Sequence, residues 1–193
     1  MPLVAELEKI RKEAEAASAE AGRLCDSLGE ESLAWRPQPG RWSIAEQLLH
    51  LEATTHAFLP VVDQSIAEAR SKGLTSTGPF RLGLKGQLFV WYNEPPPVFR
   101  LPAPKVLRPR MEAAVTEALP RFLKSQMLMM ERLELANGLD ITRARLASPF
   151  ASYIRMSLFA LFSVFTAHER RHLWHMAKLR RQLAERAEAA PQG

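Results

Sequence analysis

Apolar residues recur at helical spacing in four long stretches of this 193-residue chain, and this periodicity constrains its fold more than any other feature. In the first stretch, steps of three and four residues separate apolar or small side chains at Leu3, Leu7, Ile10, Ala14, Ala17, Ala21, Leu24 and Leu28. Such a one-sided stripe predicts an amphipathic helix of about seven or eight turns. We expect it to stop at Gly29, since glycine readily adopts the left-handed conformation at a helix end.

The second stretch follows a turn at residues 35–40, where two prolines and a glycine rule out a helix. Ser43 is a typical N-cap, and Glu46 three residues later completes a capping box. The buried side of this helix is marked by Ile44, Leu48, Leu51, Phe58, Val62 and Ile66. Pro60 is expected to bend or break the helix, which should end near residues 71–73.

The third stretch predicts a helix from about Met111 to Ala136, ended by Asn137 and Gly138. The fourth predicts a helix that starts near residues 152–157 and continues to about Ala187, followed by a frayed tail at 189–193. No segment alternates convincingly enough to predict a strand. The sequence therefore predicts an all-α, single-domain four-helix bundle over residues 1–193.

Residues 73–109 form a long Pro/Gly-rich connection between the second and third helices. A short helix is expected within it, at residues 82–91. A connection of this length is what two parallel neighbouring helices need, because the chain must return along the bundle. Long irregular connections in compact domains are usually functional or flexible.

Charge and cysteine content exclude several classes of protein. The net charge is +5 and the pI about 9.7, but the basic residues are spread along helices and no nucleic-acid-binding motif accompanies them. We therefore predict no nucleic-acid partner. No apolar run is long enough to span a membrane and the N-terminus lacks a signal-peptide core. Cys25 is the only cysteine, which excludes an internal disulfide and a thiolate metal cluster and favours a cytoplasmic location.

Three histidines lie inside the apolar face of the fourth helix. At about 100° per residue, His168, His172 and His175 fall among the leucines of that face, and a buried imidazole without a partner costs about 1–3 kcal/mol. His168 and His172 are four residues apart, the spacing at which two helical histidines bind one metal ion. His50 lies at the edge of the second helix's leucine stripe, so periodicity alone does not select it. Together, His50, His168 and His172 would provide three neutral nitrogen ligands. They would leave coordination positions open, which is typical of a reactive site.

The alternative is that these histidines are hydrogen-bonded core residues without a metal. His175 is a reserve ligand, or a group that orients the ligands. Glu46 is explained by the capping box, although it lies one turn before His50 and could orient it or act as a base. His56 is interpreted as a surface residue. Glu169 and Arg171 flank the histidines and are expected to form surface ion pairs.

Two motifs resemble those of a known family. Residues 35–51 (WRPQPGRWSIAEQLLHL) are similar to the helix-two signature of DinB-like proteins, the damage-inducible B superfamily. Residues 167–173 (AHERRHL) resemble their helix-four signature, in which two metal-binding histidines lie four residues apart. The resemblance covers nearly the whole chain, and the proline-rich segment 94–109 departs from the family by its length.

The resemblance implies a four-helix bundle with a crossover between helices two and three. It also implies zinc or nickel bound to His50, His168 and His172, and a homodimer. Relatives include transferases and isomerases that use low-molecular-weight thiols. The leading hypothesis is therefore a metal-dependent thiol transferase or hydrolase, in which the metal activates a thiol or water. Basic residues would attract an acidic thiol, and the small-molecule substrate would lie beneath the 73–109 connection. The alternative is a non-catalytic, metal-stabilised binding or dimerisation module.

Overall fold

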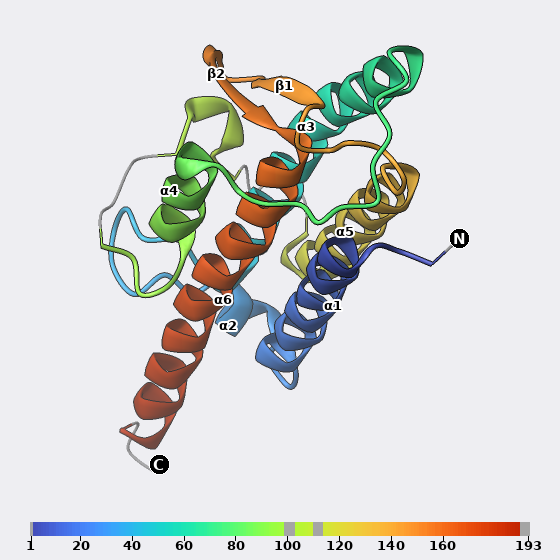
Figure 1. Ribbon diagram of the computed structural model, residues 1–193. Helices are drawn as coiled ribbons and strands as arrows, with labels where there is room; N and C mark the ends of the chain where they lie inside the picture. The colour runs from blue at the N-terminus through green and yellow to red at the C-terminus, as the bar shows by residue number, and fades with distance from the viewer. Residues whose placement is uncertain (1, 99–102, 110–113, 190–193) are drawn as a thin grey trace.

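A four-helix bundle forms the body of the computed structural model, which describes residues 2–98, 103–109 and 114–189 (Figure 1). Its long helices are α1 (Ala5–Cys25), α3 (Ile44–Ser71), α5 (Ala118–Leu135) and α6 (Leu158–Glu188). The shorter elements are α2 (Glu30–Ala34), α4 (Leu84–Asn93), the 3-10 turns η1 (Lys105–Leu107) and η2 (Val115–Glu117), and the strands β1 (Arg145–Ser148) and β2 (Ala151–Ser157). The predicted all-α bundle is confirmed. No described helix is long and apolar enough to cross a membrane.

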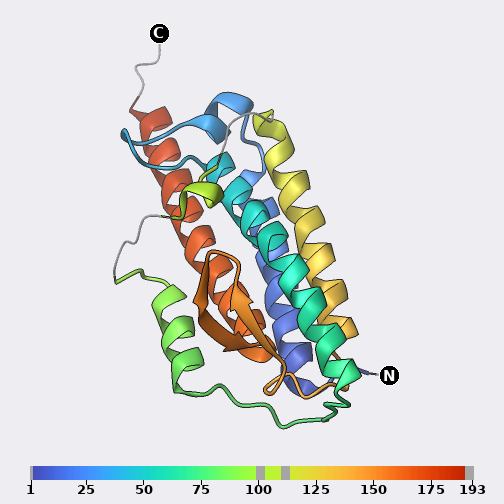
Figure 2. The same cartoon turned by 90° about the horizontal axis from the view of Figure 1, so that it is seen from above.

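Ion pairs between α3 and α5 establish that these neighbouring helices run parallel. Arg121 binds Glu52 and Arg132 binds Asp63, and each pair is separated by 69 residues in the sequence. A constant separation along two helices means that both advance in the same direction. Figure 2 shows α4, which lies between α3 and α5 in the sequence, on the outside of the bundle. The predicted crossover is therefore present, and it contains the expected short helix, α4.

Helices α3 and α6 also pack against each other, but in opposite directions. Gln47 contacts His172, whereas His50, one turn later on α3, contacts His168, one turn earlier on α6. Helix α6 has α1, α3 and α4 as neighbours, so several of its faces are covered. This surrounded position of α6 determines which of its polar residues become buried.

The first helix ends earlier than predicted. It stops at Cys25, and Ser27, not Gly29, adopts the left-handed conformation, with a φ of 62°. Gly29 instead has an extended conformation (φ −73°) and is the N-cap residue of α2, the short helix that follows. The prediction that Gly29 ends the first helix was wrong because a second, short helix starts there.

The start of α3 agrees with its predicted signals. Ser43 accepts a hydrogen bond from the backbone N–H of Glu46, and the Glu46 carboxylate accepts one from the backbone N–H of Ser43. Pro60 does not break the helix, which continues to Ser71. Its side chain is exposed, so water can bind the backbone carbonyl that lacks a helical donor.

Helices α5 and α6 both begin later than predicted, and one predicted absence was wrong. Helix α5 begins at Ala118, so Pro120 lies in its first turn, where a proline needs no N–H partner. The expected start near Met111 lies outside the described residues. Residues 145–157 form an antiparallel hairpin, not the start of the fourth helix, which begins at Leu158 with Ser157 as its N-cap. The hairpin was missed because burial along β2 does not alternate strictly.

The core has two apolar clusters with polar side chains between them. One cluster packs Phe58, Phe162 and Phe165 towards the hairpin end, and the other packs Ile44 and Phe122 towards the opposite end. The buried polar residues between them include Gln47, His50, Thr54, Gln126, Thr166, Glu169 and His172. This polar layer is where a functional site can be built inside an otherwise apolar bundle.

Candidate metal centre

Three histidines from two helices converge within the polar layer. His50 lies in the second turn of α3, and His168 and His172 lie one turn apart on α6. The Nε2 atom of His168 is 3.4 Å from Nε2 of His50 and 3.0 Å from Nε2 of His172. All three candidate ligand atoms lie within 4.8 Å of one another. The structure thus brings together the three histidines that the sequence predicted as ligands.

Hydrogen bonds on the far side of two rings orient these nitrogens. Nδ1 of His50 is 2.8 Å from the backbone carbonyl oxygen of Leu107, which can only accept, so Nδ1 carries the proton and donates it. Nδ1 of His172 likewise donates to the side-chain oxygen of Gln47, at 2.5 Å. With their protons on Nδ1, both imidazoles present an unprotonated Nε2 to the common point. Metal-binding histidines in proteins are commonly held by such a hydrogen bond.

The arrangement fits a divalent metal ion. Bonds of about 2.0–2.1 Å from a tetrahedral zinc would separate two ligand nitrogens by about 3.3 Å, close to the 3.0 and 3.4 Å between Nε2 of His168 and its two neighbours. Without an ion, a single proton on Nε2 of His168 can satisfy only one of the two lone pairs that face it. One cation bound by His50, His168 and His172 would satisfy all three nitrogens.

All three imidazoles are neutral near pH 7, which is the state that binds metal. Burial lowers the pKa of His50 below its usual value, although the hydrogen bond to Leu107 opposes this. Burial, followed by the electrostatic effects of His50 in its protonated form and of Arg171, lowers the pKa of His168 to about 3. Burial also holds the pKa of His172 well below its usual value, with His168 as the next contributor. Protons therefore compete weakly with a metal ion for these nitrogens.

The family of the chain is established by comparison with known proteins. The family model described as the DinB superfamily matches residues 8–176, which include all three histidines and both signature motifs. The chain belongs to the DinB superfamily. No curated protein and no solved structure matches it.

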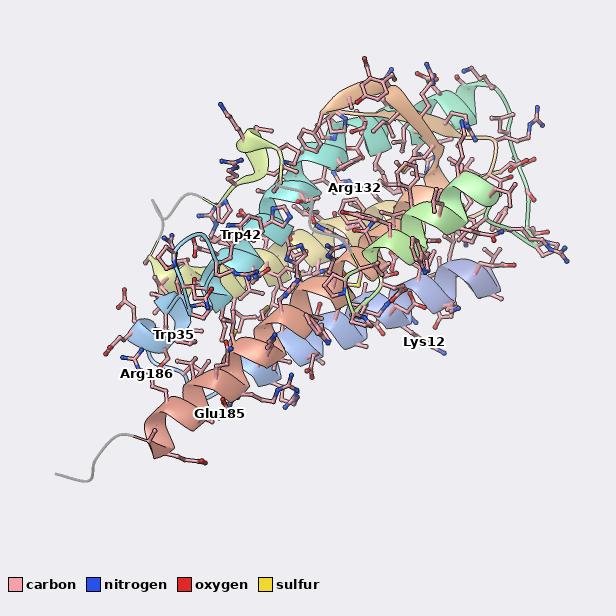
Figure 3. The ribbon with its side chains drawn as sticks, turned by 90° about the vertical axis from the view of Figure 1, so that its left-hand side faces the viewer. Lys12, Trp35, Trp42, Arg132, Glu185 and Arg186 are labelled. Atoms are coloured by element: carbon pink, nitrogen blue, oxygen red, sulfur yellow. The ribbon has the colours of Figure 1, made fainter. Side chains whose placement is uncertain are left out.

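Trp42 covers one side of the histidine cluster in this DinB-superfamily protein. Its ring centroid is 4.7 Å from that of His50 and 6.1 Å from that of His172, with which it is stacked. Figure 3 shows Trp42 beside the first turns of α3. His50 and His172 are buried, and His168 is only partly exposed.

The other two histidines do not join the cluster. The ring of His175 is 6.4 Å from that of His172, centroid to centroid, and His175 is absent from the group of converging ligand atoms. His56 is on the surface, as predicted, with its side chain 48% exposed and Nε2 3.8 Å from Glu52. Neither residue closes the coordination sphere.

Glu46 is held by structural contacts. Besides forming the capping box, its carboxylate accepts two hydrogen bonds from the guanidinium of Arg36, at 2.7 and 2.5 Å. The carboxylate is therefore engaged on both oxygens. The structural interpretation of Glu46 accounts for its contacts without a role as a base.

Glu169 is buried, and the prediction that it forms a surface ion pair was wrong. It is 3% exposed, its Oε1 accepts a hydrogen bond of 2.6 Å from Gln126, and its Oε2 has no described partner. Burial raises the pKa of its carboxyl to about 7, against the opposing effects of Gln126 and Arg170. The position is buried because α6 has neighbours on several sides, which a single helical stripe does not reveal.

Replacing Glu169 by glutamine should change how stability depends on pH. In the folded protein Glu169 stays protonated up to about pH 7, whereas in the unfolded chain its carboxyl ionises near pH 4.5. As the pH rises from 4.5 to 7, ionisation therefore stabilises the unfolded chain alone, and the folded protein loses stability. Glutamine cannot ionise, so in metal-free protein Glu169→Gln should be more favourable for stability at pH 8 than at pH 4.5. The change it causes in the free energy of unfolding should differ between the two pH values by up to about 3 kcal/mol. Urea denaturation at both pH values measures this difference.

The matched control is Glu185→Gln, because Glu185 is exposed on the same helix. As a surface substitution it should change the free energy of unfolding by less than about 0.5 kcal/mol at either pH. Equal effects of the two substitutions at pH 8 would contradict the assignment of a raised pKa to Glu169.

Proposed function

We propose that this protein is a metal-dependent enzyme, either a transferase that uses a small acidic thiol or a hydrolase that uses water. The observation that carries the proposal is the convergence of three neutral imidazole nitrogens, from His50, His168 and His172, on one point inside the bundle. Zinc or nickel, when bound, would lower the pKa of a coordinated thiol or water enough to supply a nucleophile near neutral pH.

The chain's own residues would hold this site rigid and leave one side of it open. Leu107 and Gln47 fix the orientation of the His50 and His172 rings, and Trp42 excludes water from one side. Within the described part of the chain, the group of converging ligands has three members and no fourth side chain. Three protein ligands with an open position are typical of catalytic zinc sites, whereas structural sites usually have four.

The charge around the cluster favours an anionic substrate. Besides burial, the charge of Arg171 lowers the pKa of His168 and of His172, and the charges of Lys178 and Arg41 act in the same direction on His175. Two carboxyl groups lie near the ligands in the sequence, but Glu46 is paired with Arg36 and Glu169 is hydrogen-bonded to Gln126. Three neutral ligands also leave the full charge of a divalent ion uncompensated. Such a positive region attracts anions and concentrates them at the site.

The test uses cobalt-loaded protein and two thiols that differ in charge. Mercaptosuccinate carries two carboxylates, and 2-mercaptoethanol carries none. We expect both thiols to perturb the visible absorption of the bound cobalt. Mercaptosuccinate should bind at least about tenfold more tightly at low salt, and this preference should shrink as salt screens the charges. Transfer of the bound thiol to a chromogenic electrophile then measures turnover.

Lys178→Ala tests the positive region without removing a ligand. We expect it to weaken mercaptosuccinate binding about threefold to tenfold and to leave 2-mercaptoethanol unaffected. Lys12→Ala on α1, whose side chain is 69% exposed, is the control and should change neither. A protein that binds cobalt but does not respond to either thiol would contradict the proposal. That result would support the alternative, a non-catalytic metal-stabilised binding or dimerisation module.

We also propose the cytoplasm as the place of action. The single cysteine, Cys25, is a free thiol, and burial raises its pKa to about 11. A reducing compartment would keep both Cys25 and a small thiol substrate reduced.

A further inference from the structure

Helix α4 carries an exposed apolar stripe that no described part of the chain covers. Leu84, Leu88 and Trp91 are 85%, 61% and 54% exposed. Their spacing of four and three residues places them on one face of the helix. Lys85 is the only charged residue of α4. Exposed apolar side chains that share one face usually mark an interaction site.

The opposite face fixes α4 to the bundle, so the helix cannot bury this stripe by turning over. Gly86 lies so close to α6 that a Cβ built there would be 3.3 Å from Cβ of Ala160. At the other end, Arg171 donates a hydrogen bond of 2.8 Å to the carbonyl oxygen of Tyr92, and Arg170 forms an ion pair with Glu94. Figures 1 and 2 both show α4 on the outside of the bundle, next to α6.

The stripe is complementary to itself. It is nearly symmetric about Leu88, with Leu84 one turn before and Trp91 about one turn after. If two copies of α4 pack antiparallel about a two-fold axis at Leu88, the two Leu88 side chains meet, and Leu84 of each copy faces Trp91 of the other. The two Lys85 side chains then lie at opposite ends of the pair, each near the partner's Trp91 ring, an arrangement that favours a cation–π contact. Isologous contacts of this kind are the usual basis of homodimers.

The stripe forms an apolar area of useful size. Leu84, Leu88 and Trp91 together would contribute on the order of 400 Å² of apolar surface per copy. A stable interface buries about 800 Å² per partner, with an apolar centre and a polar rim. The patch is large enough to form that centre.

We propose that the exposed face of α4 binds the same face of a second copy of this chain, antiparallel about Leu88. This assigns a surface to the predicted homodimer and does not depend on the proposed enzymatic function. A membrane is the less favoured occupant, because interfacial helices are rich in lysine and arginine on their polar face, whereas the far face of α4 packs against α6.

Light scattering on size-exclusion fractions tests the proposal with matched variants. The wild-type protein should have twice the chain mass of 21.7 kDa, in high salt as well as low. Leu88→Lys should weaken the dimer at least about 30-fold, because it places two like charges at the axis. Met127→Lys is the control, since Met127 on α5 is also 61% exposed. Circular dichroism should report the same helix content for both variants.

Disulfide trapping tests the antiparallel register. In a Cys25→Ser background, Leu88→Cys should cross-link to itself on mild oxidation. Leu84→Cys should cross-link to Trp91→Cys and much less to itself. A monomeric wild type, a dimer that survives Leu88→Lys, or preferential self-linkage at Leu84 would overturn the proposal. Monomers that bind anionic phospholipid vesicles through α4 would overturn it in favour of a membrane contact.

Discussion

Replacing any one of His50, His168 and His172 by alanine is expected to reduce bound zinc or nickel from about one ion per chain to less than about a tenth of that. Each imidazole supplies one of the three nitrogens that converge within the described residues, so its removal leaves two of these ligands. Two ligands do not define a site for a divalent ion that prefers four coordination positions. Plasma mass spectrometry on tag-free, metal-supplemented protein measures the content directly.

His56→Ala is the matched control, because His56 lies on the same helix as His50 but is exposed on the surface. His175→Ala is a second control on α6. Both should retain about one ion per chain. Gln47→Ala should retain the ligands but lose the hydrogen bond to His172, with an expected loss of about 10–100-fold in metal affinity. Full metal content in His50→Ala, or none in the wild type, would contradict the assignment.

Phe122→Ala is expected to lower the free energy of unfolding by about 3–5 kcal/mol. Phe122 is fully buried at 0% exposure, in the apolar cluster that joins α5 to Ile44 and Leu48 of α3 and to Met176 of α6. Truncation would leave a cavity beside the two helices that carry the histidines. The midpoint of thermal unfolding should fall by about 10 °C.

Urea denaturation of metal-free protein measures the effect of this substitution on folding alone. Met127→Ala, on the same helix and 61% exposed, should change the free energy of unfolding by less than about 0.5 kcal/mol. A loss below about 1 kcal/mol for Phe122→Ala would mean that the cluster repacks around the missing ring.

Local signals predicted most of the elements. Ser43 and Glu46 marked the start of α3 correctly because a capping box involves only residues of one helical turn. Gly29 misled because glycine, although most common just after a helix, is also accepted as an N-cap, and the short α2 that follows carries too little periodicity to distinguish the two. Pro120 would have given the correct start of α5, since proline is common in a helix's first turn.

The prediction that Glu169 lies on the surface failed because α6 is covered by several neighbouring helices. A helical stripe identifies the face that meets one neighbour, but α6 has α1, α3 and α4 around it. Glu169 therefore lies in the core, hydrogen-bonded to Gln126 of α5, although it is outside the histidine stripe. The contact of His50 with Leu107 was equally hidden, because a backbone carbonyl 57 residues away has no sequence signal.

The sequence by itself determined the helices, the crossover and the pair of histidines one turn apart on α6, because each depends on spacing along one segment. Only the tertiary structure decided that His50 meets this pair, that Leu107 and Gln47 orient the rings, and that the apolar face of α4 is left exposed. These outcomes depend on which helix faces pack together. The helix faces that pack together are those that remove the most apolar surface from water in the two clusters combined. That total depends on several helices at once, so no single stretch of sequence encodes it.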